Sequence, residues 1–342
     1  LKDVIETLPA PPVPEVSRRF IDWVADYTLA PAGAVLKMAM SVPDALLEPK
    51  PAIAYIRNPV LSPALTLTAA RRRVLDFVGE GPPRIAAEIA REAGVGAGVV
   101  KALVELGALL PQSLPAKVPA RPDWTRAGPS LSPEQSAAAD DLAAKTAAGG
   151  YSVTVLDGVP GAGKTEVYFQ AVAAALAAGR QALVLLPEIA LGAQWLSRFR
   201  ARFGADPAVW LSEIGPARRR ATWRAVAAGL AGVVVGARSA LFLPFHDLGV
   251  IVVDEEHDGS YKQEEGVIYN ARDMAVVRAR LSAIAAVLVS ATPSLETVAN
   301  IQAGRYGVHH LRDRHGGARL PDVSLIDIRA EKLPAGRWLS AP

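Results

Sequence analysis

The 342-residue sequence contains no cysteine, so it cannot form a disulfide or a thiolate-bound zinc site. It also lacks a long apolar run. Its apolar stretches are short or Ala-rich and are broken by charges, so we expect no membrane span and no membrane partner. The N-terminus lacks the charged start, apolar core and cleavage site of a secretion signal. These absences favour a cytoplasmic location.

The composition indicates a globular protein with more than one domain. Hydrophobic residues make up 51% of the chain, which excludes a disordered protein and allows sizeable cores. A chain of this length is expected to form two or three domains. The formal net charge is +3, which permits a nucleic-acid partner without requiring one.

Pro-rich stretches divide the first part of the chain. Residues 15–41 show apolar residues at helical spacing, interrupted at Pro31. Residues 66–112 contain three short amphipathic segments separated by GEGPP and GVGAG, which are the proportions of a helix-turn-helix or winged-helix unit. A small helical packing domain without DNA contacts is the alternative. Residues 113–130 contain several prolines and are expected to form a linker.

From residue 131 onward the pattern changes. Apolar strands alternate with helical segments, and the strands are VTVLDG, QALVLLP, GVVVGA, GVIVVDEE and AAVLVSATP. This alternation predicts an α/β fold with a parallel sheet and crossover helices. A ligand of such a sheet is expected beyond the C-terminal ends of its strands.

The first of these strands runs into GVPGAGKT, which fits the phosphate-loop pattern G-x-x-x-x-G-K-[ST], and a helical segment follows. The backbone N–H groups of such a loop and the helix N-terminus bind phosphate oxygens. We expect Lys164 to contact the β and γ phosphates of ATP and the hydroxyl of Thr165 to bind Mg²⁺. A Gly-rich turn without a ligand is the alternative. The residues expected to bind ATP in this loop are Gly158, Val159, Pro160, Gly161, Ala162, Gly163, Lys164 and Thr165.

Three acids and a histidine, residues 254–257, follow the strand GVIVV. A strand that ends in solvated charges is one explanation. With a phosphate loop upstream, however, Asp254 is the expected protein partner of Mg²⁺. Glu255 is then the expected base that orients and deprotonates the attacking water. Both are predicted catalytic residues, together with Lys164 and Thr165.

Three other features gain a role from their order along the chain. The strand AAVLVSATP ends in Ser290, Ala291 and Thr292, a segment that couples nucleotide state to movement along a strand in helicase-type ATPases. His257 is placed to link the nucleotide site to this segment. Gln135 precedes the first strand of the sheet, and its amide can bind both the donor and the acceptor of an adenine edge. Each of these also has an ordinary structural explanation, as a strand-to-loop turn, a surface histidine or a residue at a helix start.

Four blocks in this order resemble the PriA family of replication-restart helicases, in helicase superfamily 2: DGVPGAGKTEVY, LLPEIAL, GARSALFLPFHDLGVIVVDEEHDGSYKQEEGVIYNARDMAVVRA and SATPSLE. General helicases share only the phosphate loop, the acidic motif and SAT, so the long block is the more specific one. The resemblance implies a RecA-like helicase lobe at residues 131–312 and a winged helix at residues 66–112. Residues 1–50 would be the C-terminal part of a domain that binds a 3′ DNA end.

The resemblance also implies that the chain is truncated at both ends. It would begin after the family's N-terminal strands, and residues 313–342 would lead towards a cysteine-rich region and a second lobe with its arginine finger. Zn²⁺ is therefore expected only outside this sequence, and weak ATP turnover is expected from the fragment alone. Pro160 and Ala162 replace the family's usual Thr and Ser, and an aliphatic pair after Gly266 replaces its usual aromatic.

By this resemblance the protein is an ATP-dependent 3′ to 5′ DNA helicase, located with the nucleoid. It would recognise stalled or abandoned forks and initiate primosome assembly to reload the replicative helicase. Its expected partners are forked and single-stranded DNA, single-stranded-DNA-binding protein and other primosome proteins. A fork-binding primosome scaffold with a dispensable ATPase is one alternative, and another superfamily 2 translocase is a second.

The segment SYKQEEGVIYNARD resembles the family's DNA-sensing loop and combines rings with cations, as single-strand binders do. An ordinary surface hairpin is the alternative. The side chains after the strand GVVVGA are placed to touch DNA phosphates. The residues expected to contact DNA are Lys2, Arg238, Ser239, Tyr261, Lys262, Tyr269 and Arg272.

Overall fold

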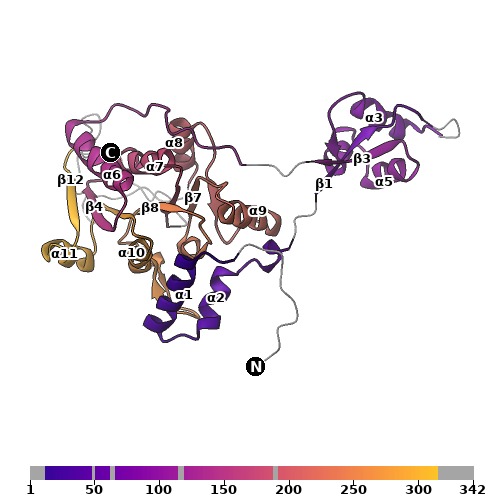
Figure 1. Ribbon diagram of the computed structural model, residues 1–342. Helices are drawn as coiled ribbons and strands as arrows, with labels where there is room; N and C mark the ends of the chain where they lie inside the picture. The colour runs from indigo at the N-terminus through magenta and orange to yellow at the C-terminus, as the bar shows by residue number, and fades with distance from the viewer. Residues whose placement is uncertain (1–11, 48–50, 62–65, 115–118, 188–191, 315–342) are drawn as a thin grey trace, which may run out of the picture.

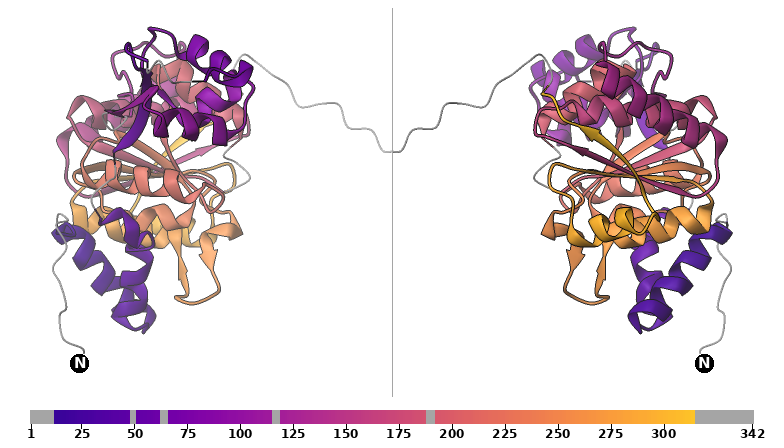
Figure 2. Two further views of the ribbon diagram at one scale, coloured as in Figure 1. Left: turned by 90° about the vertical axis from the view of Figure 1, so that its right-hand side faces the viewer. Right: turned by 90° about the vertical axis from the view of Figure 1, so that its left-hand side faces the viewer.

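A computed structural model describes residues 12–47, 51–61, 66–114, 119–187 and 192–314. Its main feature is a seven-stranded sheet in the order β12-β4-β11-β8-β5-β7-β6, in which every pairing is parallel (Figures 1 and 2). The strands are β4 (Ser152–Gly158), β5 (Gln181–Leu185), β6 (Ala208–Trp210), β7 (Val233–Gly236), β8 (Leu248–Val253), β11 (Ala285–Ser290) and β12 (Gly307–Leu311). The parallel α/β fold predicted from the alternating pattern is confirmed.

Helices cover both faces of this sheet because its strands are apolar on both sides. Along β5, Ala182 and Val184 face one core, whereas Leu183 and Leu185 face the other. The helices of the first core are α6 (Pro133–Ala148), α7 (Lys164–Ala177) and α8 (Ala193–Phe203). Those of the second are α1 (Glu15–Thr28), α2 (Ala32–Ala39), α9 (Pro216–Ala227) and α10 (Ala271–Ser282), and α11 (Leu295–Gln302) lies at its margin. Within the described ranges no helix is long and apolar enough to cross a membrane.

The helices α1 and α2 are packed onto the sheet unit. The rings of Phe20 and Phe242 lie 5.2 Å apart, and the indole of Trp223 donates to Ala39 O at 3.1 Å. Residues 12–47 therefore share a core with the lobe, and the predicted boundary at residue 50 does not separate two cores.

A second, smaller unit has a core of its own (Figure 1). Its elements are β1 (Ala52–Arg57), α3 (Ala69–Val78), β2 (Arg84–Ile85), α4 (Ala86–Glu92), α5 (Ala97–Glu105) and β3 (Leu109–Leu114). The strand β1 pairs antiparallel with both β2 and β3. Three helices with a three-stranded antiparallel sheet are the composition of a winged helix. The unit extends beyond the predicted 66–112 at both ends, because β1 lies upstream and β3 ends at residue 114.

The predicted linker at 113–130 is only partly a linker. Its first two residues belong to β3, and residues 119–130 of it contact the lobe. The N–H of Asp123 donates to Phe203 O at 2.8 Å, and the buried Arg202 donates to Arg126 O. Prolines and charges suggested an exposed connection, but these two hydrogen bonds to α8 attach it to the sheet unit.

Candidate nucleotide site

The phosphate loop connects β4 to α7 at the C-terminal edge of the sheet. Gly161 and Gly163 have φ values of 83° and 77°, which side-chain-bearing residues adopt at a cost. Lys164 Nζ donates to Gly158 O at 2.6 Å and to Val159 O at 3.4 Å. Burial lowers the pKa of this ammonium, although nearby acids counteract the effect. The loop therefore surrounds a partly desolvated cation, as binding of a phosphate requires.

Gln135 supports this loop from α6. Its Nε2 donates to Ala162 O at 2.8 Å, and its Oε1 accepts from Ser132 N at 2.8 Å in a capping box. A Cβ built on Gly163 would lie 2.6 Å from the same Nε2, so the amide packs directly against the loop. The sequence predicted an adenine contact for this amide. In the structure, both the nitrogen and the oxygen of this amide form hydrogen bonds with the backbone of the chain itself. The adenine contact stays a prediction.

Tyr168, on α7, joins the phosphate loop to the acids after β8. Its hydroxyl donates to Asp254 Oδ2 at 2.9 Å and accepts from Trp195 Nε1 at 2.7 Å. The side chain of Thr165, one turn earlier on the helix, lies close enough to this hydroxyl to oppose the rise that burial causes in its pKa. The sequence analysis missed Tyr168. The available signal was its position three residues after Thr165, on the same helical face.

The two predicted magnesium ligands thus both lie near one phenolic oxygen. Burial raises the pKa of Asp254 to about 6, although hydrogen bonds from Tyr168 and from Glu255 N oppose this effect. A buried carboxylate beside a hydroxyl offers the hard oxygen atoms that Mg²⁺ prefers. No group of three or more His, Asp or Glu side chains in the described residues could hold a metal unaided. The side chains fit a cation that takes its other ligands from a nucleotide and water.

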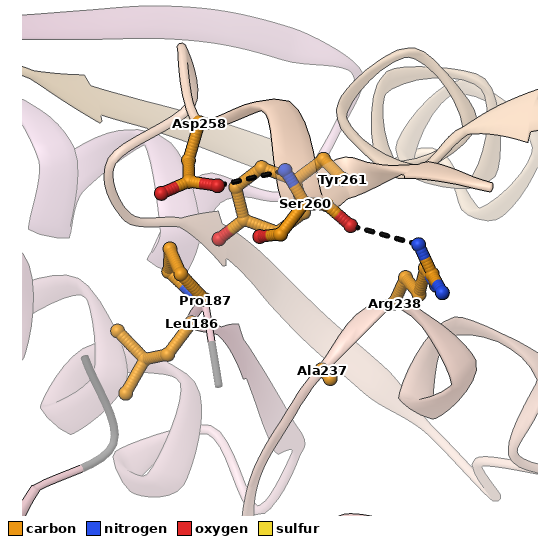
Figure 3. Close-up of a pocket in the computed structure, with 7 residues that line it drawn as sticks. All are labelled: Leu186, Pro187, Ala237, Arg238, Asp258, Ser260 and Tyr261. Atoms are coloured by element: carbon orange, nitrogen blue, oxygen red, sulfur yellow. Dashed lines mark hydrogen bonds between the residues drawn. The ribbon is translucent and has the colours of Figure 1, made fainter. Parts of the chain in front are cut away.

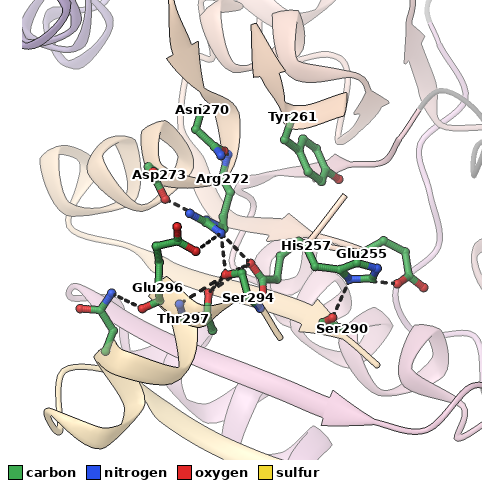
Figure 4. A network of polar contacts seen from close by, with 12 residues as sticks. Glu255, His257, Tyr261, Asn270, Arg272, Asp273, Ser290, Ser294, Glu296 and Thr297 are labelled. Atoms are coloured by element: carbon green, nitrogen blue, oxygen red, sulfur yellow. Dashed lines mark hydrogen bonds and ion pairs between the residues drawn. The ribbon is translucent and has the colours of Figure 1, made fainter. Parts of the chain in front are cut away.

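Glu255 and His257 lie next to each other at the same edge, as Figure 4 shows. Glu255 Oε2 is 3.7 Å from His257 Nδ1, and its side chain is 40% exposed. His257 Nδ1 forms a 2.7 Å hydrogen bond with Ser290 Oγ, which also accepts from Thr292 N at 2.9 Å. The structure therefore brings the acidic motif and the segment from Ser290 through Ala291 to Thr292 into contact. Coupling between them stays a prediction.

The third acid, Glu256, is buried, and it belongs to a polar network with Arg272, Ser294 and Thr297, which Figure 4 shows. Its carboxylate accepts from Ser294 N at 2.7 Å, from Thr297 Oγ1 at 3.1 Å and from Arg272 Nη1 at 3.3 Å. Arg272 also donates to Asp273 and to Ser294 Oγ. The predicted DNA contact of Arg272 is wrong in this structure, because its guanidinium is buried against these acceptors. Glu256 had no role in the sequence analysis.

Two predicted stacking residues are also buried, which corrects the prediction. Tyr261 is 1% exposed, and its hydroxyl lies 2.6 Å from Asp254 O. Tyr269 is 3% exposed and packs its ring against Phe242 at 5.5 Å. The segment folds back as the hairpin β9 (Lys262–Gln263) and β10 (Tyr269–Asn270), which carries both rings into the core. Neither ring has a free face for a DNA base.

One cation of this region, the half-buried Arg238, lines a cavity of about 210 Å³ (Figure 3). Arg238, at the start of the short helix η2 (Arg238–Phe242), donates to Ser260 O at 3.0 Å and to Lys262 O at 2.7 Å. Ser239 and Lys262 are exposed, and Lys262 Nζ lies 3.0 Å from Glu264. Contacts of Arg238, Ser239 and Lys262 with DNA stay predictions. Lys2 lies outside the described residues.

Comparisons with known proteins agree with this site. The DEAD/DEAH box helicase family matches residues 132–301. Replication restart protein PriA of Rickettsia prowazekii is 49% identical over 187 residues, which are 55% of this chain and 29% of that protein. PriA of Bacillus subtilis is 37% identical over 271 residues, 77% of this chain and 33% of that protein. PriA of Chlamydia pneumoniae is 33% identical over 330 residues, 91% of this chain and 43% of that protein.

Solved structures are more distant. RecG bound to a three-way DNA junction has a TM-score of 0.42 and 18% identity, and the match covers 76% of this chain and 36% of that one. The helicase domain of Pyrococcus furiosus Hef has a TM-score of 0.38 and 18% identity, over 52% of this chain and 38% of that one. The chain spans less than half the length of the curated relatives described above.

Proposed function

Because this chain belongs to the PriA family of replication restart proteins, we propose that it supplies the ATP-binding lobe of an ATP-dependent DNA helicase. The full-length protein moves 3′ to 5′, recognises stalled or abandoned forks and initiates primosome assembly. Its partners are forked and single-stranded DNA, single-stranded-DNA-binding protein and other primosome proteins. The restart part of this proposal rests on the similarity to these relatives, because a nucleotide site alone is common to many motors.

The observation that carries the ATPase proposal is the hydrogen bond from Tyr168 to Asp254, which joins the helix that follows the phosphate loop to the acids after β8. With MgATP bound, Lys164 contacts phosphate oxygens, and Thr165 and Asp254 hold the cation. Glu255 keeps an exposed carboxylate one residue beyond Asp254, so it is free to orient and deprotonate a water. The transition state also needs an arginine, which in this reaction class comes from a second protein part.

DNA is proposed to lie along the exposed cations at the C-terminal edge of the sheet. Arg238 lines the cavity of Figure 3, and its guanidinium donates to the backbone oxygen of the exposed Lys262. Ser239, the next residue along the chain, is also exposed. The exposed face of such a cation contacts phosphates and carries no base specificity. The winged-helix unit supplies a second DNA contact, because that fold places a helix or wing against a duplex.

ATP hydrolysis by the full-length protein, with and without forked DNA, tests the proposal. We expect DNA to stimulate hydrolysis, and Lys164→Ala to abolish it while fork affinity is retained. Lys145→Ala is the matched control, because this lysine pairs with Asp141 on α6 outside the phosphate loop. Hydrolysis that forked DNA leaves unchanged contradicts a motor. Full restart activity of Lys164→Ala in a reconstituted loading assay favours the scaffold alternative.

A further inference from the structure

The end of β12 lies directly against the start of the phosphate loop. This strand pairs with β4 along its whole length, and Leu311 is the register partner of Gly158 (Figure 1). Leu311 O accepts from Val159 N at 3.2 Å. A Cβ built on Gly158 would lie 2.9 Å from the Cβ of Leu311, so the two strands lie too close for a side chain at position 158. The loop therefore begins in contact with β12.

His310 and Asp157 face each other one residue before this contact. They are register partners on β12 and β4, and His310 Nδ1 lies 3.0 Å from Asp157 Oδ2. Because an ionised carboxylate can only accept, the imidazole donates in this hydrogen bond. Among the described residues Asp157 has no ion-pair partner other than His310. The two side chains are 52% and 30% exposed, so the pair lies at the surface of the edge strand.

The carboxylate of Asp157 acts on the cation of the phosphate loop. The next residue, Gly158, accepts from Lys164 Nζ at 2.6 Å through its carbonyl oxygen. Burial lowers the pKa of this ammonium, and the charges of Glu255, Asp254 and Asp157 oppose the effect. Asp157 is therefore near enough to influence Lys164, and its charge repels the phosphates that this lysine is proposed to bind. The loop pattern begins at Gly158 and does not require an acid before it.

The adjacent histidine of β12 has a different partner. His309 Nε2 lies 2.8 Å from Asp141 Oδ2 on α6, and the same carboxylate oxygen accepts from Lys145 Nζ at 2.6 Å. This second pair joins β12 to a helix, whereas the pair of His310 joins it to the residue before the phosphate loop. Two neighbouring histidines thus offer a matched comparison of one strand with and without contact to the loop.

We propose that His310 is a positioning residue of the ATP site. By donating to Asp157 it holds this carboxylate against β12 and offsets its charge beside the bound triphosphate. This role rests on the proposed function, ATP binding at the phosphate loop. The effect is on nucleotide affinity, because neither side chain of the pair belongs to the groups that hold Mg²⁺ or activate the water. A change confined to binding raises KM and leaves kcat unchanged.

The first experiment measures DNA-stimulated ATP hydrolysis by the full-length protein over a range of ATP concentrations. His310→Ala is expected to raise KM for ATP about two- to fivefold, the scale of an exposed charge pair, with kcat unchanged. Labelled-ATP affinity should weaken by the same factor. His310→Asn keeps an N–H donor near the position of Nδ1 and is expected to retain the parent KM. His309→Ala, the matched control on the same strand, is expected to leave KM unchanged.

Removal of the carboxylate separates a charge effect from a loosened strand. Asp157→Asn leaves no charge for His310 to offset, so adding His310→Ala to it is expected to leave KM unchanged. A histidine that only supported β12 would raise KM on removal by the same factor in both backgrounds. An equal rise in both backgrounds, or an unchanged KM in the single variant His310→Ala, overturns the proposal.

Lys164→Ala distinguishes failure of this role from failure of the proposed function. If Lys164→Ala hydrolyses ATP like the parent protein, the nucleotide binds elsewhere, and both the proposed function and the role of His310 are overturned. If Lys164→Ala is inactive while His310→Ala has the parent KM, the role of His310 alone is overturned.

Discussion

The hydroxyl of Tyr168 donates a 2.9 Å hydrogen bond to Asp254 Oδ2 in a fully buried position. This single contact joins α7, which begins at the phosphate loop, to the acids that follow β8. Trp195 donates to the same hydroxyl, so the phenol has a fixed orientation. The carboxylate of Asp254 is therefore positioned from the helix that carries Lys164 and Thr165.

We predict that Tyr168→Phe impairs the use of magnesium. The variant leaves a carboxylate oxygen and the Trp195 N–H unpaired, which costs about 1–3 kcal/mol in a buried site. Turnover of ATP is expected to fall about tenfold, and the Mg²⁺ concentration for half-maximal hydrolysis to rise. A magnesium titration of hydrolysis by the full-length protein measures both. Tyr151→Phe, whose ring is half exposed, is the control. A fall in turnover without a change in magnesium requirement contradicts this role.

A second prediction concerns Asp254 and pH. Burial raises its pKa from 3.8 to about 6, so between these values the folded protein retains a proton that the unfolded chain has released. Stability therefore falls as pH rises from about 4 to about 6. Asp254→Asn should stabilise the protein at pH 8 by about 3 kcal/mol, from roughly two pKa units at about 1.4 kcal/mol each. Near pH 4 the gain should vanish.

Urea unfolding in magnesium-free buffer at pH 4 and pH 8 measures this difference. The exposed Asp247→Asn serves as the control, since it removes a carboxylate from the surface. A gain in Asp254→Asn that is equal at both pH values would show that it does not arise from ionisation of the carboxyl.

The arrangement of the candidate nucleotide site could be predicted from the sequence because each of its two motifs is local and the parallel sheet brings them together. The pattern GVPGAGKT fixes a loop between a strand and a helix, and Asp254 directly follows an apolar strand of the same parallel sheet. Parallel strands end at one edge, so the two motifs had to meet there. Tyr168 was missed because its position three residues after Thr165 places it on the right helical face but does not show that its hydroxyl bears a hydrogen bond.

The DNA-contact residues could not be predicted as well, because side-chain direction in a short hairpin depends on tertiary packing. Tyr261 and Tyr269 lie in a polar segment of the sequence, which suggested that their rings are exposed. The hairpin instead carries both rings into the core. Arg272 likewise satisfies a buried acid, Glu256, that lies 16 residues earlier in the chain. The hydrophobic period of so short a segment does not specify which residues face inward.

A third prediction concerns Glu256, whose buried carboxylate accepts from Arg272, Ser294 and Thr297. Glu256→Gln leaves Arg272 with the exposed Asp273 and Glu296 as its acidic partners, and breaking a buried pair costs about 3 kcal/mol or more. Glu264→Gln is the control, because its partner Lys262 is exposed and such a pair contributes about 0–1 kcal/mol. Urea unfolding of the two variants compares them directly. Equal stabilities would mean that the network does not hold α11 and the acidic motif together.

The last prediction separates Glu255 from Asp254. Glu255→Gln keeps the shape and polarity of the side chain but removes the base, so hydrolysis should fall by about 10²–10⁴ while nucleotide binding persists. Asp254→Asn should instead weaken magnesium-dependent nucleotide binding, because it removes a negative ligand. Labelled-ATP affinity with and without Mg²⁺, together with turnover on forked DNA, measures the two effects in the full-length protein. Loss of magnesium-dependent binding in Glu255→Gln, with binding retained in Asp254→Asn, would reverse the two roles.

The backbone at Glu255 allows a sharper version of this test. Its φ is 48°, in the left-handed region, which costs a residue with a Cβ about 1–2 kcal/mol and costs glycine little. Glu255→Gly should therefore be at least as stable as the parent protein and yet lose hydrolysis to the same extent as Glu255→Gln. Unfolding measurements and single-turnover hydrolysis on the same samples decide the point. If Glu255→Gly is more stable but loses turnover, the strained glutamate is retained for its carboxylate. Unchanged turnover would mean that another group activates the water.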